Sequence, residues 1–164
     1  MTLVTPALLE VAATLKARGE TVAVAESSTG GLIAATLLAV PGASAYFLAG
    51  SVVYTLASRR LLLGLTAADV AGLEPLSEPM VRVFAQRVRA QFGATWGIAE
   101  LGAAGPAGAR YGHPPGTSVI AVVGPGADKH DTSITVATGS PDREANMWRF
   151  TTAAVELLGH ALRG

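Results

Sequence analysis

The sequence is poor in several kinds of residue, and each scarcity excludes a class of protein. None of the 164 residues is cysteine, which excludes disulfide bonds and thiolate metal sites. Charged residues make up only 15%, and the 12 acidic and 12 basic side chains give a net charge of zero. No basic stripe is available for a phosphate backbone, so nucleic acid is not an expected partner. Only two of the bases are lysines, Lys16 and Lys129.

Long apolar runs are also missing, although half of the residues are hydrophobic. None reaches the ~18 residues that a membrane span requires. Met1 is followed by polar and small residues instead of a basic region and a cleavage site, so no signal peptide is expected. We therefore expect a cytoplasmic protein with no membrane partner. The length fits one domain over residues 1–164, and the apolar composition favours a homo-oligomer.

Strand and helix patterns alternate along most of the chain. Thr5 and Pro6 are typical of a helix start, Ser77 and Glu78 of another, and Thr66 to Asp69 of a capping box. Helices are expected over 6–18, from 30, after 66, from 77 and from 139 to 163. Strands are expected over 21–26, 45–54, 95–99, 117–123 and 131–137. A short turn is expected over 58–64 and a hairpin turn over 124–129.

This order predicts an α/β fold, a three-layer α/β/α sandwich around a mixed, largely parallel sheet. Ligands of such folds lie beyond the carboxyl ends of the strands. Three glycine-bearing turns follow predicted strands, over Ser27–Gly31, Gly102–Gly108 and Gly139–Arg143. We expect these three turns to converge on one cleft.

The stretch from Thr21 to Thr36 is the most informative in the chain. An apolar, β-branched run is followed by Ser27, Ser28, Thr29, Gly30 and Gly31 and then by a helical pattern. A strand that turns into a helix directs free N–H groups at whatever lies above the turn, and glycine allows close approach. The turn either binds a ligand and offers a serine nucleophile, or it caps an ordinary helix through Ser28 or Thr29.

A serine nucleophile needs a base, and the sequence offers no obvious one. His113 lies in a Pro/Gly-rich loop, His130 in a hairpin turn and His160 near the C-terminus. Glu26 is adjacent to Ser27, but neighbours on a strand point to opposite faces. No cluster of acids and histidines predicts a metal site, and no cofactor motif is present. Arg143 is either a phosphate-binding cation at a helix start or a surface partner on that helix.

Several collinear blocks resemble the CinA C-terminal domain family. They are Ala25-Glu-Ser-Ser-Thr-Gly-Gly31, Val40-Pro-Gly-Ala-Ser-Ala-Tyr-Phe47, Val52-Val-Tyr54, Gly102-Ala-Ala-Gly-Pro106, Pro115-Gly-Thr117 and Asp142-Arg-Glu144. The resemblance covers nearly the whole chain. It is to the stand-alone form, without the molybdopterin-binding-like domain of longer members.

The resemblance implies a nicotinamide-nucleotide amidohydrolase, which converts nicotinamide mononucleotide to nicotinate mononucleotide and ammonia. It implies Ser27 as the nucleophile, with Tyr54 also in the catalytic site. Ser28, Thr29, Gly30, Gly31, Gly102, Gly105 and Arg143 would then bind substrate. The pattern alone makes Tyr54 a core residue. The family's name also suggests competence or DNA damage, which the neutral charge does not support.

Two positions depart from the family pattern. The family lysine that activates the serine corresponds to Arg59, and a family threonine corresponds to Leu101. Arginine has a pKa above about 12 and cannot act as a general base at neutral pH. Arg59 would instead hold Tyr54 or the substrate phosphate. The alternative hypothesis is a weak or inactive homologue that binds a nucleotide or a partner.

Overall fold

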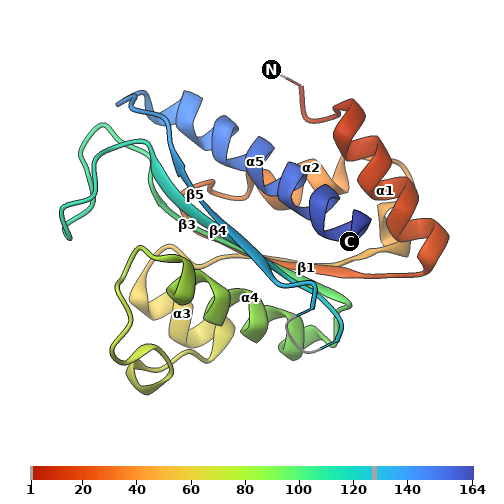
Figure 1. The fold of residues 1–164 in the computed structure, drawn as a ribbon, viewed down its shortest axis with the longest axis horizontal. Helices are drawn as coiled ribbons and strands as arrows, with labels where there is room; N and C mark the ends of the chain where they lie inside the picture. The colour runs from red at the N-terminus through yellow and green to blue at the C-terminus, as the bar shows by residue number, and fades with distance from the viewer. Residues whose placement is uncertain (1, 127–128) are drawn as a thin grey trace.

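A five-stranded mixed sheet forms the centre of the molecule in this computed structural model, which describes residues 2–126 and 129–164 (Figure 1). The strand order is β2-β1-β3-β4-β5, where β1 is Val22–Glu26, β2 Phe47–Val52, β3 Trp96–Ala103, β4 Thr117–Val123 and β5 Thr132–Ala137. Strand β1 pairs in parallel with both β2 and β3, and the other two pairs are antiparallel. The α/β class and the mixed sheet agree with the sequence prediction.

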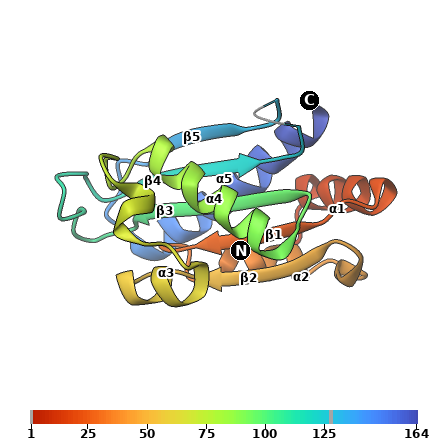
Figure 2. The ribbon, with the colours of Figure 1, turned by 90° about the horizontal axis from the view of Figure 1, so that it is seen from below.

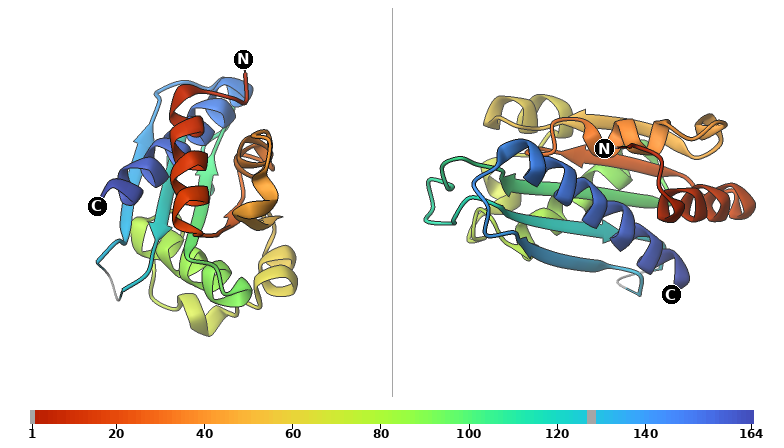
Figure 3. Two further views of the ribbon diagram at one scale, coloured as in Figure 1. Left: turned by 90° about the vertical axis from the view of Figure 1, so that its right-hand side faces the viewer. Right: turned by 90° about the horizontal axis from the view of Figure 1, so that it is seen from above.

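Helices cover both faces of the sheet, as the views from below and above show (Figures 2 and 3). One face carries α1, α2 and α5, and the other carries α3, the 3₁₀ turn η2 and α4. Their bounds are Pro6–Arg18 for α1, Leu32–Leu38 for α2, Leu56–Leu63 for α3, Ala67–Val70 for η2, Glu78–Phe92 for α4 and Arg143–Arg163 for α5, with a second 3₁₀ turn, η1, at Ala43–Ala45.

The strand alternation divides the core into two apolar clusters. Val24 of β1, Ile98 of β3 and Ile120 of β4 pack toward α1, α2 and α5. Ala25 and Leu101, one position out of phase, pack toward α4. The same alternation puts Glu26, Glu100 and Ser118 on the α2 and α5 face, where a polar cluster replaces the apolar packing.

Helix ends follow the predicted capping signals. Thr5 caps α1, and its hydroxyl accepts from Leu8 N at 3.2 Å. Ser77 caps α4 through Met80 N. Gly19 and Gly93 end these helices in the left-handed conformation that glycine adopts without strain.

The segment predicted as a short turn over 58–64 is a helix. Thr55 caps α3 through Ser58 N, and Gly64 ends it. The Thr-x-x-Ser box that starts this helix precedes the leucine run, and the two arginines among the leucines concealed the helical period.

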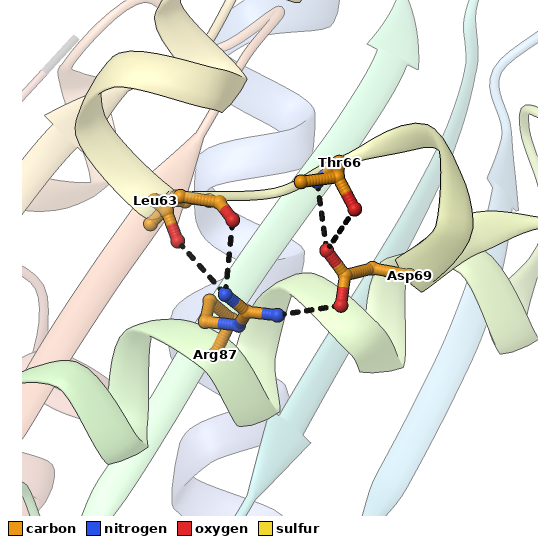
Figure 4. Close-up of polar contacts among 5 residues, drawn as sticks. Leu63, Thr66, Asp69 and Arg87 are labelled. Atoms are coloured by element: carbon orange, nitrogen blue, oxygen red, sulfur yellow. Dashed lines mark hydrogen bonds and ion pairs between the residues drawn. The ribbon is translucent and has the colours of Figure 1, made fainter.

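Next to α3, the predicted Thr66 capping box is confirmed. Asp69 Oδ2 accepts from Thr66 N at 2.7 Å, and Asp69 Oδ1 forms an ion pair with Arg87 at 2.8 Å (Figure 4). Arg87 also donates to the Leu63 and Gly64 carbonyls, so it links the end of α3 to η2 and α4.

Two predicted strands have different bounds. Strand β2 is confined to 47–52, because residues 43–45 form η1 and Tyr46 enters the core. Its pairing with β1 is irregular between Val22 and Ala23. A Cβ on Gly50 would lie 2.7 Å from Ala34 Cβ, so glycine allows α2 to pack closely on β2.

Strand β3 continues to Ala103, four residues beyond the predicted end. Gly102 therefore belongs to the sheet, where it pairs with Ser118 of β4, and the loop begins only at Ala104. The predicted hairpin turn over 124–129 includes positions 127 and 128, which lie outside the described residues.

Candidate functional site

A pocket of about 210 Å³ lies where the predicted turns meet. It is bordered by Ser28 after β1, Tyr54 after β2, Gly102 and Gly105 at the end of β3, and Arg143 at the start of α5. The loop over 104–116 extends from this end of the sheet, at the left in Figure 1. The convergence predicted for the three glycine-bearing turns is thus confirmed.

Glu26 holds the start of α2 from inside the protein. This fully buried carboxylate accepts from the amides of Gly31, Ile33 and Ala34 at 2.9–3.0 Å, and from Thr29 Oγ1 at 2.6 Å. The capping hypothesis required the side chain of Ser28 or Thr29 to cap the helix, and neither does. The N-cap residue is Gly31, and the Glu26 carboxylate accepts from the amides of the first turn instead. A buried carboxylate at a helix N-terminus is favoured by these donors and by the helix dipole.

Glu100 of β3 is a second fully buried carboxylate beneath the same turn. Its Oε2 accepts from Ser27 N and Thr29 N, both at 3.1 Å. Its Oε1 accepts a short hydrogen bond from Ser28 Oγ and another from Ser118 Oγ at 3.0 Å. Burial raises the pKa of Glu100, and the hydrogen bonds from the turn and from Ser118 oppose that rise.

The two glutamates use most of the amides that the turn was expected to offer an outside anion. Glu26 takes the N–H groups of Gly31, Ile33 and Ala34, and Glu100 takes those of Ser27 and Thr29. Gly30 N donates to Ser27 O. The geometry therefore gives no support to a phosphate bound on these amides, and the substrate-binding roles of Thr29, Gly30 and Gly31 stay predictions.

The two neighbouring serines differ in their surroundings. Ser28 borders the pocket and its hydroxyl donates to Glu100. Ser27 is also nearly buried, and its hydroxyl has no hydrogen-bond partner in the described part of the chain. No base is therefore in contact with the hydroxyl of Ser27, whose nucleophilic role stays a prediction.

Tyr54 and Arg59, both expected in the catalytic site, lie in different places. Tyr54 is 56% exposed and borders the pocket, so the pattern-based prediction of a core residue is wrong. Arg59 borders a separate, larger pocket of about 640 Å³ between α3, η2 and α4, where its guanidinium lies over the Phe84 ring and donates to Val53 O. Burial lowers the pKa of Arg59, and Tyr111 raises it. The structure does not bring Arg59 into the pocket that holds Ser28.

Arg143 borders the pocket, and its role as a substrate-binding cation stays a prediction. Its Nη1 donates to Gly105 O at 2.7 Å, which links α5 to the loop after β3. Fully buried Asn146, one turn further along α5, donates to Ala104 O and Ser140 O, both at 2.8 Å. These contacts fix both loops around the pocket.

Among the described residues, 2–126 and 129–164, no histidine borders this pocket. His113 lies in the 104–116 loop, as expected, and its Nδ1 is buried without a partner. No group of three acidic, histidine or cysteine side chains that could hold a metal occurs in the described part of the chain. The described helices include none that is long and apolar enough to span a membrane.

Sequence reasoning missed Glu100 entirely. The available signal was one acidic residue in the apolar run Trp-Gly-Ile-Ala-Glu-Leu. A charged residue inside a strand buried on both faces requires hydrogen-bond partners. The hydroxyl-rich turn supplies them, but no sequence rule shows that β1 and β3 are neighbours.

Comparison with known proteins identifies relatives over nearly the whole chain. The family model of the CinA C-terminal domain matches residues 5–162. CinA-like proteins from Anaeromyxobacter dehalogenans strain 2CP-1 and Anaeromyxobacter sp. strain Fw109-5 are 41% and 42% identical over 93% and 96% of this chain. The chain spans 36% and 37% of the length of these two relatives.

Solved structures match the fold at similar coverage. A competence-damaged protein (CinA) superfamily protein from Klebsiella pneumoniae 700603 has a TM-score of 0.86 and 30% identity, with 96% of each chain covered. The competence/damage-inducible protein CihA from Agrobacterium tumefaciens has a TM-score of 0.84 and 27% identity over all of both chains.

Proposed function

The chain belongs to the CinA C-terminal domain family, and on that premise we propose that it is an amidohydrolase acting on nicotinamide mononucleotide. The products would be nicotinate mononucleotide and ammonia. A serine of the turn after β1 would attack the carboxamide carbon and form an acyl-enzyme. The family match supports the kind of domain, and the substrate and the serine mechanism are the proposal.

One observation carries this proposal: the pocket that combines a serine turn with a cation. Ser28, Gly102 and Arg143 all border it. A pocket of about 210 Å³ is smaller than the 300 Å³ or more typical of drug-sized ligands. It suits the ring and the carboxamide, with Arg143 near the mouth to attract the phosphate.

The second candidate is a homologue that binds the nucleotide without hydrolysing it. Arg59 favours this alternative, because it occupies the position of the family lysine and lies in the other pocket. General acid–base assistance contributes about 100- to 10,000-fold to such reactions, and its loss would leave little turnover.

Ammonia release from nicotinamide mononucleotide by the purified protein tests the proposal. We expect release by the wild type and a raised KM in Arg143→Ala, since the substrate would lose its cationic partner. Arg149→Ala is the matched control, because Arg149 is exposed on the same helix away from this pocket.

Two further variants separate the candidates. Arg59→Lys tests the family lysine, with Arg60→Lys beside it as the control. Absence of ammonia from the wild type, together with activity in Arg59→Lys, would refute the amidohydrolase proposal. Thermal stabilisation by the nucleotide without ammonia release would favour the binding protein.

A further inference from the structure

We propose that Ser28 and Glu100 are the nucleophile and the general base of this chain. The inference rests on the proposed function only in requiring that the serine turn performs acyl transfer. It assigns a base that neither the family resemblance nor the motif pattern provides.

The hydrogen-bond pattern distinguishes Ser28 from Ser27. Ser28 Oγ donates to Glu100 Oε1, which is the contact that a serine nucleophile needs with its base. Ser27 offers only its backbone amide to the same carboxylate. Ser28 also borders the pocket, where a substrate carbonyl would arrive.

Glycine at position 102 is a second, independent observation. A Cβ there would lie 2.3 Å from Ser28 Oγ, 2.8 Å from Glu100 Oε1 and 3.1 Å from Thr117 O. The space that a side chain would fill is thus used by the two reacting groups. Because Ser28 and Gly102 both border the pocket, Ser28 belongs to the pocket wall, and buried Glu100 lies beneath it.

The surroundings of Glu100 make it a stronger proton acceptor than an exposed glutamate. Burial raises its pKa, and the hydrogen bonds from Ser28, from the turn amides and from Ser118 oppose that rise. Among the described residues Glu100 forms no ion pair, since the pair between Arg87 and Asp69 is the one found there. Glu26 of β1 is a neighbouring carboxylate, because both glutamates contact the Thr29 hydroxyl. This hydroxyl donates to Glu26 Oε2 at 2.6 Å and lies 3.1 Å from Glu100 Oε2.

Two arginines border the pocket beside this pair. Arg143 of α5 donates to Gly105 O, and Arg110 belongs to the 104–116 loop. On α4, Glu78 accepts from the hydroxyls of Ser133 and Thr135 of β5. Burial and the hydrogen bonds from the turn and from Ser118 act on the pKa of Glu100 in opposite directions, burial raising it and the hydrogen bonds lowering it.

The chemistry balances with water as the only co-reactant. Ser28 Oγ bonds to the carboxamide carbon while its proton moves to Glu100. The C–N bond then breaks, and Glu100 returns the proton to the leaving nitrogen, which departs as ammonia. Water next attacks the ester, gives a proton to Glu100, and Ser28 leaves with that proton. No backbone partner is found for the Ser28 amide among the described residues, and in this mechanism it would donate to the oxyanion.

A sulfonyl fluoride that labels activated serines tests the assignment without any nucleotide. The full-length protein is treated with phenylmethanesulfonyl fluoride from pH 5 to pH 9, and mass spectrometry of the peptides locates the label. We expect the label on Ser28 in the wild type and in Ser27→Ala. Folded Glu100→Gln should react about 100-fold more slowly, as for loss of a general base.

The Ser118→Ala variant keeps the test decisive if Glu100→Gln does not fold. It removes one donor to Oε1 and leaves the turn intact, so the pKa of Glu100 should rise. The midpoint of the labelling rate should therefore move to higher pH, an effect that a purely structural Glu100 would not produce. Thr135→Val, a hydroxyl removed from the neighbouring strand, is the control and should not move it.

Three results would overturn the proposal: label on Ser27, no label on the folded wild type, or an unchanged midpoint in Ser118→Ala. Label on Ser28 without ammonia release from nicotinamide mononucleotide would leave the pair assigned and refute only the proposed substrate. Ammonia release from nicotinamide mononucleotide with label on Ser27 would support the proposed substrate and refute the Ser28–Glu100 pair.

Discussion

Asn146 anchors the two loops that border the pocket, and its replacement by alanine should destabilise the protein substantially. The side chain is fully buried and makes three hydrogen bonds, to Ala104 O and Ser140 O at 2.8 Å and with Thr138 Oγ1 at 2.6 Å. Each hydrogen bond contributes about 1 kcal/mol net, and a buried group left unpaired costs about 1–3 kcal/mol. We expect Asn146→Ala to lower the free energy of unfolding by about 3 kcal/mol.

Urea unfolding followed by the fluorescence of Trp96 and Trp148 measures this loss. A decrease of 3 kcal/mol corresponds to a fall in Tm of about 6–12 °C for a chain of this size. Thr138→Val is the comparison variant. It removes one of the three bonds of Asn146 and also the bond that Thr138 Oγ1 accepts from Ser140 N, so it should cost about 2 kcal/mol. A change below about 0.5 kcal/mol in Asn146→Ala would refute the argument that these bonds hold the loops.

Two smaller predictions concern packing and acid sensitivity. Gly97→Ala would place a Cβ 2.2 Å from the Ala85 carbonyl oxygen, so β3 and α4 must separate, and the midpoint of urea unfolding should fall by an amount equivalent to about 1–3 kcal/mol. The Thr66 backbone amide, then its hydroxyl and Arg87, hold the pKa of Asp69 below its ordinary value of 3.8 (Figure 4). Its charged form therefore stabilises the fold above that value, and this contribution is lost as pH falls below it. Asp69→Asn should show a smaller fall in Tm between pH 5 and pH 2 than the wild type, and an equal fall would contradict the assignment.

Most of the architecture was predictable because local signals agree with the tertiary structure. Thr5 with Pro6 and Ser77 with Glu78 each start a helix where the capping rules require one. The apolar runs of β1 and β4 are buried along their whole length. The α3 helix was missed because Arg59, Arg60 and exposed leucines cover its surface, so no apolar stripe marks a buried face.

The pocket was predictable in outline, and its chemistry was not. Glycines and hydroxyls after strands indicated which turns would meet, because carboxyl ends of parallel strands share an edge. The side chains within the site depend on sheet order and on strand phase. Ser118 reaches Glu100 only because β4 pairs antiparallel to β3 in this register. Tyr54 follows an apolar run that predicts a longer strand. Strand β2 ends at Val52, and Tyr54 beyond it is exposed.

Glu100 lies 73 and 71 positions along the chain from the amides of Ser27 and Thr29 that it accepts from. These two amides are thus protected from hydrogen exchange by a side chain of another strand, and their exchange requires the hydrogen bonds to Glu100 to open. The turn cannot acquire its final shape by local folding, because the Glu100 carboxylate that accepts from its amides is synthesised about 70 residues later. During synthesis, the nucleophile of the proposed pair therefore stays unassembled until β3 has left the ribosome and joined the sheet.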